Sequence, residues 1–127
     1  KILDVGCSAG HFLVHCNNES WGVEIDDEKI KTMRDNGLNV KKCDLDKERL
    51  PFEDSTFDAV NSTFVVEHLR NPYECFLEML RVLKKGGELR IIGNRQLAYH
   101  IKLKRIFGNE RLIASNDKFV TQSAIKK

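Results

Sequence analysis

Short apolar runs alternate along the chain with segments in which apolar residues recur every three or four positions. The segments of strand length, each of which contains apolar residues, occupy residues 2–5, 21–25, 38–40, 57–63 and 88–92. Apolar runs that are bounded by glycine, proline or acidic turns are typical of strands buried in a sheet. The pattern therefore predicts five strands, with a helix in most of the gaps between them.

Three of these gaps have helical spacing. A helix is expected from Gly10 to about Asn17, and another begins at Asp26 or Asp27 and ends at Gly37. An acidic residue at a helix start accepts hydrogen bonds from backbone N–H groups, and glycine tolerates the left-handed conformation in which helices often end.

The third helix has the clearest start. Asn71 is expected to cap it, Pro72 suits its first turn, and Glu74 completes a capping box. Gly86-Gly87 is expected to end it before the fifth strand. Its apolar positions recur every three to four residues, at Tyr73, Phe76, Leu77, Leu80 and Leu83.

Strands that alternate with helices indicate parallel βαβ units and an α/β fold with an open, doubly wound sheet. Sheets of this class bind ligands beyond the carboxyl ends of their strands. Candidate functional residues are therefore sought directly after each strand.

Composition narrows the class of protein without identifying it. A chain of 127 residues, 41% hydrophobic and 31% charged, is typical of one soluble globular domain. The net charge of +2, from 21 basic and 19 acidic side chains, is too balanced to favour nucleic acid as a partner. No apolar run approaches the roughly 18 residues of a membrane span, so no membrane contact is expected.

The four cysteines are irregularly spaced, at positions 7, 16, 43 and 75. No CxxC pair is present, so neither a metal site nor a disulfide framework is expected. Reduced thiols, together with the lack of a visible signal peptide, favour a cytoplasmic location.

Three sites after the predicted strands could together hold a nucleoside. Glycines in the loop from Gly6 to Gly10 would let the backbone approach a ligand closely. Glu24 follows the second strand at close to the roughly 20-residue spacing of a ribose-binding acid. Asp44, with the backbone N–H of Leu45, could bind an adenine edge. Each feature alone is also explained by an ordinary turn or an acidic helix start, but their joint order favours a nucleoside site.

The motifs around these residues resemble those of class I S-adenosylmethionine-dependent methyltransferases of the small-molecule branch. The likeness covers roughly residues 1–93. Residues 37–40 and 44–46 are also similar to MetW-type proteins. The matching segments are Ile2–Gly10, Gly22–Asp26, Cys43–Leu45, Leu50–Phe52, Ser55–Val60, Glu67–Leu69, Glu78–Leu83 and Lys85–Gly87.

The resemblance implies a mostly parallel Rossmann-like sheet of strand order 3-2-1-4-5, with S-adenosylmethionine as cofactor. It also implies an enzyme that transfers the methyl group to a small-molecule acceptor, with no nucleic acid as substrate, and it leaves a partner protein open. The cofactor contacts that it implies are Asp4, Gly6, Cys7, Gly10, Glu24, Ile25, Asp44 and Leu45.

The chain departs from the family pattern at two places. Ser8 stands where the family usually has glycine, which is acceptable if its φ is negative. The family's sheet ends with a sixth and a seventh strand, whereas residues 124–127 resemble the start of a helix. We therefore expect residues 1–127 to be a single methyltransferase domain, a fragment that lacks the N-terminal helix and the last two strands. Strand five would then be an exposed edge.

His68 is the candidate catalytic residue. It follows the fourth strand, where the family's substrate cavity opens, and an imidazole can accept a proton near neutral pH. The alternative is a histidine fixed by backbone hydrogen bonds at a helix start. Asn71-Pro72-Tyr73 superficially resembles a motif of nucleic-acid amino-methyltransferases, but its capping role explains it, which argues against DNA base methylation.

Two rival functions stay open. A nicotinamide dehydrogenase would share the loop and the ribose acid, but residues 6–10 lack the Gly-x-Gly-x-x-Gly spacing and Asp44 would have no role. A non-catalytic binding or regulatory module would keep the cofactor fold and act through a partner protein. The amphipathic segment 97–107 is interpreted as a lid or substrate-side helix, with a partner surface as the next alternative and membrane contact as the last.

Overall fold

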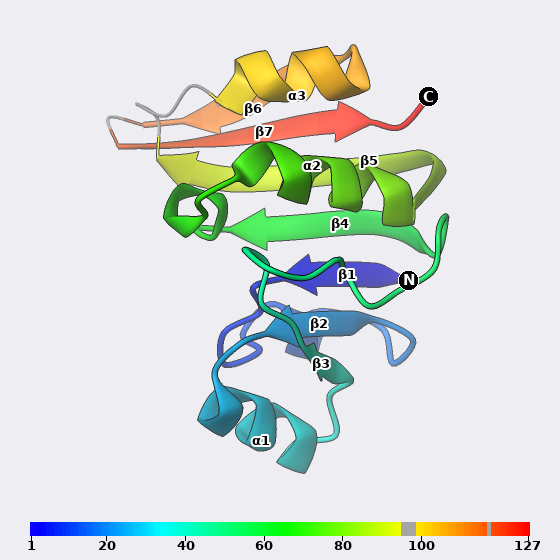
Figure 1. The fold of residues 1–127 in the computed structure, drawn as a ribbon, viewed down its shortest axis with the longest axis vertical. Coiled ribbons are helices and arrows are strands. Elements are labelled where there is room, and N and C mark those ends of the chain that lie inside the picture. The colour runs from blue at the N-terminus through cyan, green and yellow to red at the C-terminus, as the bar shows by residue number, and fades with distance from the viewer. Residues whose placement is uncertain (95–98, 117) are drawn as a thin grey trace.

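The computed structural model describes residues 1–94, 99–116 and 118–127. The strands in these ranges form one sheet in the order β3-β2-β1-β4-β5-β7-β6 (Figure 1). β1 to β5 are parallel, and β7 is antiparallel to both β5 and β6. The α/β class and the predicted order of the first five strands are confirmed. The strands are β1 (Ile2–Val5), β2 (Trp21–Glu24), β3 (Val40–Lys42), β4 (Phe57–Thr63), β5 (Leu83–Asn94), β6 (Glu110–Ser115) and β7 (Phe119–Ile125).

The prediction that the last two strands are missing is wrong. β7 pairs with β5 along its length, with Leu89 opposite Ala124, so β5 is not an edge. Residues 124 and 125, expected to begin a helix, are the end of β7. The apolar pattern fails here for a physical reason. β7 buries the polar side chains of Gln122 and Ser123, and β6 is exposed along most of its length, so neither strand is an apolar run.

The helices are α1 (Asp27–Asp35), α2 (Pro72–Val82) and α3 (Tyr99–Phe107), with single 3₁₀ turns at Leu13–His15 and Val66–His68. The helix expected from Gly10 to Asn17 is therefore reduced to one turn. Its apolar residues do not share a buried face, because Leu13 is buried while Phe12 and Val14 are 42% and 58% exposed. Without such a face, packing does not stabilise a longer helix.

Both predicted helix caps are present. The backbone N–H of Lys29 donates to Asp26 Oδ1 at 3.1 Å at the start of α1. The N–H of Glu74 donates to Asn71 Oδ1 at 3.4 Å at the start of α2. These bonds satisfy backbone donors that the first turn of a helix leaves unpaired.

The core face of α2 differs from the predicted one. The predicted positions Tyr73, Leu77 and Leu80 are only half-buried. α2 also ends at Val82, because Leu83 already pairs with Phe57 in the sheet, so β5 begins before Gly86-Gly87. The side chains of α2 that are buried are Cys75, Phe76, Met79 and Val82.

α2 and α3 lie side by side over one face of the sheet, and α1 flanks β2 and β3 at its other end (Figure 1). A large apolar core beneath α2 and α3 includes Phe57, Phe76 and Leu103, and a second cluster beneath α1 includes Ile30 and Met33. Helices packed this closely hold the strands, and the loops that follow them, in fixed positions.

The amphipathic segment falls partly outside the described residues, because residues 95–98 are not described. Its remainder is helix α3, in which Leu103 and Phe107 are buried while Lys104 and Arg105 are exposed. α3 contacts α2, β6 and β7. A role as a lid stays a prediction. No helix in the described ranges has the length and apolar character that a membrane crossing needs.

Candidate functional site

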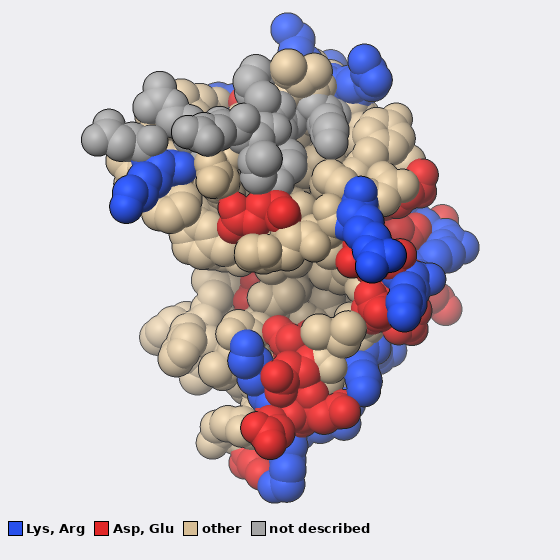
Figure 2. Space-filling model, turned by 60° about the vertical axis from the view of Figure 1, so that its left-hand side comes forward, with Lys and Arg blue, Asp and Glu red and all other residues tan. Residues whose placement is uncertain are grey.

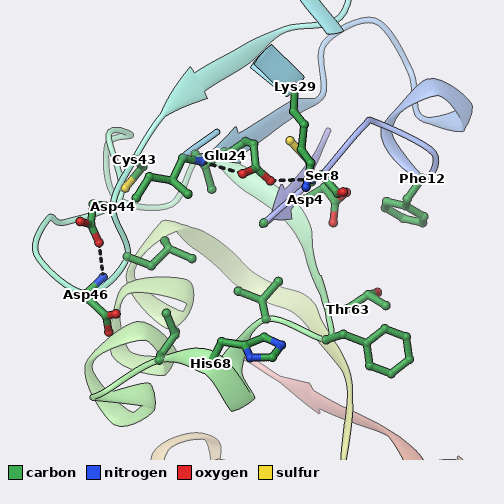
Figure 3. A pocket seen from close by; sticks show the side chains of 18 of the residues that line it. Asp4, Ser8, Phe12, Glu24, Lys29, Cys43, Asp44, Asp46, Thr63 and His68 are labelled. Carbon is green, nitrogen blue, oxygen red and sulfur yellow. Dashed lines mark hydrogen bonds between the residues drawn. The ribbon is translucent and has the colours of Figure 1, made fainter. Parts of the chain in front are cut away.

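A pocket of about 620 Å³ lies at the carboxyl end of the parallel strands. Its walls are the segments that follow β1, β2, β3 and β4, together with the 3₁₀ turn that ends at His68 (Figure 3). This is the edge at which an open α/β sheet is expected to bind a ligand, and the volume lies in the range of small-molecule sites. The three segments singled out from the sequence therefore meet at one place.

The loop after β1 comes close to the segment after β4. Gly6 has φ +73°, and a Cβ atom there would overlap the side chain of Val65. A glycine is therefore required for both its conformation and its lack of a side chain. Ser8 has φ +50°, so the negative φ under which a serine would be readily accepted in place of the family's glycine is not present. A serine in this region is unusual and holds the loop in a strained conformation.

Gly10 is the predicted cofactor contact that does not line the pocket. A Cβ atom at Gly10 would lie 2.8 Å from Leu38 Cδ1 and 3.1 Å from Met33 Cγ. Its φ of +86° lies in the region that favours glycine. Gly10 thus allows the loop to pack against the end of α1.

Glu24 is fixed in place by backbone donors. Its Oε1 accepts from the N–H of Ser8 at 2.9 Å (Figure 3). Its Oε2 accepts from the N–H groups of Ile25 at 2.9 Å and Asp26 at 3.0 Å. A carboxylate has about four acceptor positions, so acceptor capacity remains for a hydroxyl group in the pocket. Glu24 also joins the loop after β1 to the end of β2.

Asp44 begins the tight turn after β3. Its Oδ1 accepts from the N–H of Asp46 at 3.0 Å (Figure 3). Its own N–H donates to Glu48 Oε1 at 2.9 Å. Leu45, half-buried beside it, contributes an apolar wall. Asp46 Oδ1 in turn accepts from the N–H of Arg70 at 2.8 Å, which ties this turn to the segment before α2.

Asp4 is a buried carboxyl group at the base of the pocket, with 4% of its surface exposed. Its Oδ1 accepts a hydrogen bond from Asn61 Nδ2 at 3.0 Å. Burial raises the pKa of Asp4 to about 6, and the bond from Asn61 only partly opposes this. Among the described residues no Lys or Arg forms an ion pair with Asp4. A cation bound in the pocket would therefore stabilise its charged form.

Cys7 and Ile25 also line the pocket, and they differ in burial: Cys7 is buried, whereas Ile25 is exposed. Cys7 is 4% exposed, and its Sγ donates to Met33 Sδ at 3.5 Å. Burial, aided by the charges of Asp4 and Glu24, raises the pKa of the Cys7 thiol to about 12, so it is a neutral, apolar wall. Ile25 is 53% exposed at the rim.

His68 lies at the rim of the pocket, across from Glu24 (Figure 3). Its side chain is 77% exposed, and its Nε2 is 4.0 Å from Glu67 Oε1. Its backbone N–H donates to the carbonyl of Val65 at 3.0 Å, which closes the 3₁₀ turn. The imidazole is thus open to a ligand, and its role as a base stays a prediction.

Sequence reasoning missed several residues of the pocket. Phe12 and Phe64 are aromatic side chains of the pocket wall that are 42% and 41% exposed. Lys29 reaches the pocket from the first turn of α1. Phe64 could have been found from the rule that directs attention to the ends of strands, because it directly follows β4.

The charged side chains of the pocket are mostly acidic. Four carboxylates line it, from Asp4, Glu24, Asp44 and Asp46, against the single cation of Lys29. Figure 2 shows a hollow in this face of the molecule, with acidic side chains gathered below it over β2, β3 and α1. A site of this sign attracts a cation and disfavours a ligand with several phosphates.

The family model described as a methyltransferase domain matches residues 3–91 of the chain. The ribosomal RNA large subunit methyltransferase G of Colwellia psychrerythraea is 41% identical over 145 residues, which cover 99% of this chain and 36% of that protein. The protein of the same name from Serratia proteamaculans is 37% identical, over 98% of this chain and 38% of that protein. The chain thus spans little more than a third of the length of these curated relatives.

Solved structures of low sequence identity share the fold. The YcgJ protein of Bacillus subtilis superposes with a TM-score of 0.79 at 14% identity, over 99% of this chain and 91% of that one. A putative methyltransferase in a complex with the Haloferax volcanii Trm112 methyltransferase activator superposes with a TM-score of 0.76 at 16% identity, over 98% and 80% of the two chains.

The predictions of a small-molecule acceptor and of no nucleic acid are wrong, because the curated relatives are named as ribosomal RNA methyltransferases. The exclusion of nucleic acid rested on the resemblance to the small-molecule branch and on the net charge of the whole chain, and that net charge averages two parts of different charge. Residues 94–127 contain eight Lys and Arg against two Asp and Glu, whereas residues 1–93 contain 13 against 17. A basic segment of this kind is typical of proteins that bind nucleic acid, and it is not visible in the net charge of the whole chain.

Proposed function

The chain belongs to the methyltransferase domain family, and from that premise we propose that its pocket binds S-adenosylmethionine and that the protein methylates a base of ribosomal RNA. The resemblance to class I methyltransferases read from the motifs agrees with this membership.

The observation that carries the cofactor proposal is the sign and placement of the carboxylates. S-adenosylmethionine has a cationic sulfonium and an ammonium group, whereas a nicotinamide dinucleotide has two phosphates. The pocket offers the buried carboxyl group of Asp4 and three further acidic side chains against one lysine. Electrostatics therefore favour the sulfonium cofactor over the dinucleotide of the rival dehydrogenase.

Each part of the cofactor has a matching group in the pocket. Asp4 suits the ammonium group of the methionine moiety, where a positive charge would offset the cost of burying its carboxylate. Glu24, held by three backbone donors, suits the ribose hydroxyls. Asp44 has its Oδ1 engaged by Asp46, which leaves Oδ2 for an exocyclic amine. Gly6, Cys7, Ile25 and Leu45 supply close, mostly apolar contacts.

The chemistry that S-adenosylmethionine supplies when bound is a methyl group already activated on a sulfonium sulfur. The protein therefore mainly has to align the acceptor with the methyl group and exclude water, and it does not need a strongly acidic, basic or nucleophilic side chain. Where the acceptor nitrogen or oxygen must lose a proton, His68 at the rim is the group that can take it.

RNA as the acceptor is supported by two independent observations. The curated relatives that match nearly the whole chain are ribosomal RNA methyltransferases. The segment after β5 carries a large excess of Lys and Arg, and side chains of this kind contact the phosphate backbone without reading sequence.

Calorimetric titration with S-adenosylhomocysteine tests the cofactor site. We expect micromolar binding by the wild type and no detectable heat with NAD. Glu24→Gln and Asp44→Asn should each weaken binding at least tenfold, because each removes acceptors for a charged or polar group. Asp35→Asn, an exposed substitution on α1 outside the pocket, is the matched control. A chain shown to be folded by circular dichroism that binds no S-adenosylhomocysteine would overturn the proposal.

Transfer of a labelled methyl group to in vitro transcribed large-subunit ribosomal RNA tests the acceptor and His68. We expect His68→Ala to lose most of kcat while it keeps its affinity for S-adenosylhomocysteine. Unchanged kcat would remove His68 from the mechanism, and loss of affinity would make it a binding residue instead. Label found in no RNA with the wild-type protein would overturn the proposed acceptor.

A further inference from the structure

Two of the segments that wall the pocket come from strands that are not neighbours in the sheet. The cofactor turn (residues 43–48) follows β3 and carries Asp44 and Leu45, which are assigned to the cofactor above. The acceptor segment (residues 64–70) follows β4 and carries His68. β2 and β1 lie between β3 and β4 in the sheet. Strand pairing therefore does not join the two segments directly, and a contact outside the sheet has to do so.

The acceptor segment is anchored by hydrogen bonds at both of its ends. At its start, the N–H of Phe64, whose φ is +56°, donates to the carbonyl of Ile92 in β5 at 2.8 Å. At its end, the N–H of Arg70 donates to Asp46 Oδ1 at 2.8 Å. The backbone N–H of His68, between these anchors, is used within its own 3₁₀ turn. One anchor of the acceptor segment thus belongs to β5, and the other belongs to the cofactor turn.

Asp46 is the residue that both segments share. Its N–H donates to Asp44 Oδ1 at 3.0 Å (Figure 3), while its own Oδ1 accepts from Arg70. A hydrogen bond to a carboxylate is roughly twice as strong as one between neutral groups. Leu45 and Leu69, half-buried residues of the two segments, both pack against the large apolar core. The bond from Arg70 to Asp46 therefore joins two segments that already rest on a common base.

We propose that Asp46 is a positioning residue, through which a cofactor bound at Asp44 orders the acceptor segment that carries His68. This inference rests on the proposed function, because it needs a cofactor at Asp44 and an acceptor near His68. Asp46 acts through the backbone of Arg70 and is assigned no contact with the methyl group or the base. Alignment governs the rate of such a transfer, since a misplacement of about 1 Å can cost about a hundredfold.

The coupling has to be reciprocal. If a bound cofactor strengthens the bond between Arg70 and Asp46 by some factor, then loss of that bond must weaken cofactor binding by the same factor. Hydrogen exchange at the amide of Arg70 measures the first factor, and calorimetric titration measures the second. We expect about fivefold for both, the lower end of typical couplings, because Asp46 and Arg70 are both exposed.

The exchange of the Arg70 amide, followed by nuclear magnetic resonance with and without S-adenosylhomocysteine, is the direct test. In the wild type it should be about fivefold slower when the ligand is bound. In Asp46→Ala it should be fast and insensitive to the ligand, and affinity for S-adenosylhomocysteine should fall by the same factor. Asp46→Asn keeps a side-chain oxygen that can accept from Arg70, so it should restore most of the protection.

Turnover on in vitro transcribed ribosomal RNA measures the consequence for the reaction. We expect Asp46→Ala to lower kcat about tenfold at saturating S-adenosylmethionine and RNA, because the acceptor is held less well. Asp46→Asn should remain within about twofold of the wild type.

Asn71→Ala is the matched control. It removes the oxygen that accepts from the N–H of Glu74 at 3.4 Å, and so loosens the junction of the same segment with α2 while it leaves Asp46 intact. It should lower stability, as loss of a helix cap does, but keep the ligand-dependent protection of Arg70 and a kcat within about twofold of the wild type.

The outcomes separate this inference from the proposed function. Wild-type protein that binds S-adenosylhomocysteine without slower exchange at Arg70 would overturn the coupling alone. So would a kcat of Asp46→Ala within about twofold of the wild type, or an equal loss of kcat in Asn71→Ala. A loss in Asp46→Asn as large as that in Asp46→Ala would assign the effect to charge and refute the role of the bond. Wild-type protein that binds no S-adenosylhomocysteine would overturn the cofactor site, and the coupling with it.

Discussion

Replacing the buried acid of the pocket, Asp4→Asn, should stabilise the folded protein while it weakens the cofactor site. The pKa of Asp4 rises from 3.8 to about 6 because burial disfavours its charged form. At about 1.4 kcal/mol for each pKa unit, this corresponds to about 3 kcal/mol spent on keeping the group ionised at neutral pH. Asparagine is neutral and nearly isosteric, and its Oδ1 can still accept from Asn61.

The sign of the pH dependence follows from the raised pKa. In the wild type, the stability associated with protonated Asp4 is fully present below pH 3.8 and is lost as the pH rises through 6. Asp4→Asn has no such loss. Allowing for imperfect replacement of the hydrogen bond, we expect it to be more stable than the wild type by about 2 kcal/mol at pH 8 and nearly equal at pH 4. The gain corresponds to a rise in Tm of roughly 5–10 °C.

Urea unfolding followed by circular dichroism at both pH values measures this difference. The exposed substitution Asp35→Asn is the control, and it should change stability by less than about 0.5 kcal/mol at either pH. Calorimetry at pH 8 should show that Asp4→Asn binds S-adenosylhomocysteine more weakly than the wild type. A variant no more stable than the wild type at pH 8, or a gain of equal size at pH 4, would refute the reasoning.

Three further predictions concern the backbone and the polar contacts around the pocket. Gly6→Ala should lower the free energy of unfolding, measured by urea melts, by at least about 1 kcal/mol more than Gly37→Ala does. Both glycines have positive φ, but only at Gly6 would the added Cβ atom overlap a neighbouring side chain. Phe64→Gly should be more stable than Phe64→Ala by about 1 kcal/mol, since only glycine relieves φ of +56°; equal melting temperatures would contradict the strain. Glu78→Gln should destabilise the protein by about 1–2 kcal/mol at pH 7 and by less at pH 4. Hydrogen bonds from Arg81 and from the backbone of Leu50 hold the pKa of Glu78 below its usual value, so the stability that they provide is lost as the pH falls. A destabilisation that does not change with pH would contradict this explanation.

The parts of the fold that the sequence predicts are those whose cause is local. Strands β1, β2 and β4 are recognisable because each carries apolar side chains that the sheet buries, among them Leu3, Val23 and Val60. The caps at Asp26 and Asn71 depend only on residues within one turn. Glu24 and Asp44 could be placed at one pocket because the carboxyl ends of parallel strands share an edge of the sheet.

The parts that the sequence does not predict depend on contacts between distant segments. β7 pairs with β5 on one side and with β6 on the other, and it buries the polar side chains of Gln122 and Ser123, so no local pattern predicts these two strands. The positive φ of Ser8 is imposed by a loop that Glu24 holds from the next strand. Phe64 likewise owes its conformation to the carbonyl of Ile92, which the sheet brings beside it from the neighbouring strand β5.

Because β7 lies between β5 and β6, the outer edge of β5 stays unpaired during synthesis until β7 has been made, and an unpaired strand edge promotes aggregation. β5 is a strand of 12 residues with alternating buried positions, and its outer edge is paired by residues 119–125, which leave the ribosome after it. Until then β5 presents unpaired N–H and C=O groups to any other nascent chain. A chain that stops before residue 119 would keep that edge permanently, so we expect such truncations to form inclusion bodies although the residues assigned to the cofactor are all present.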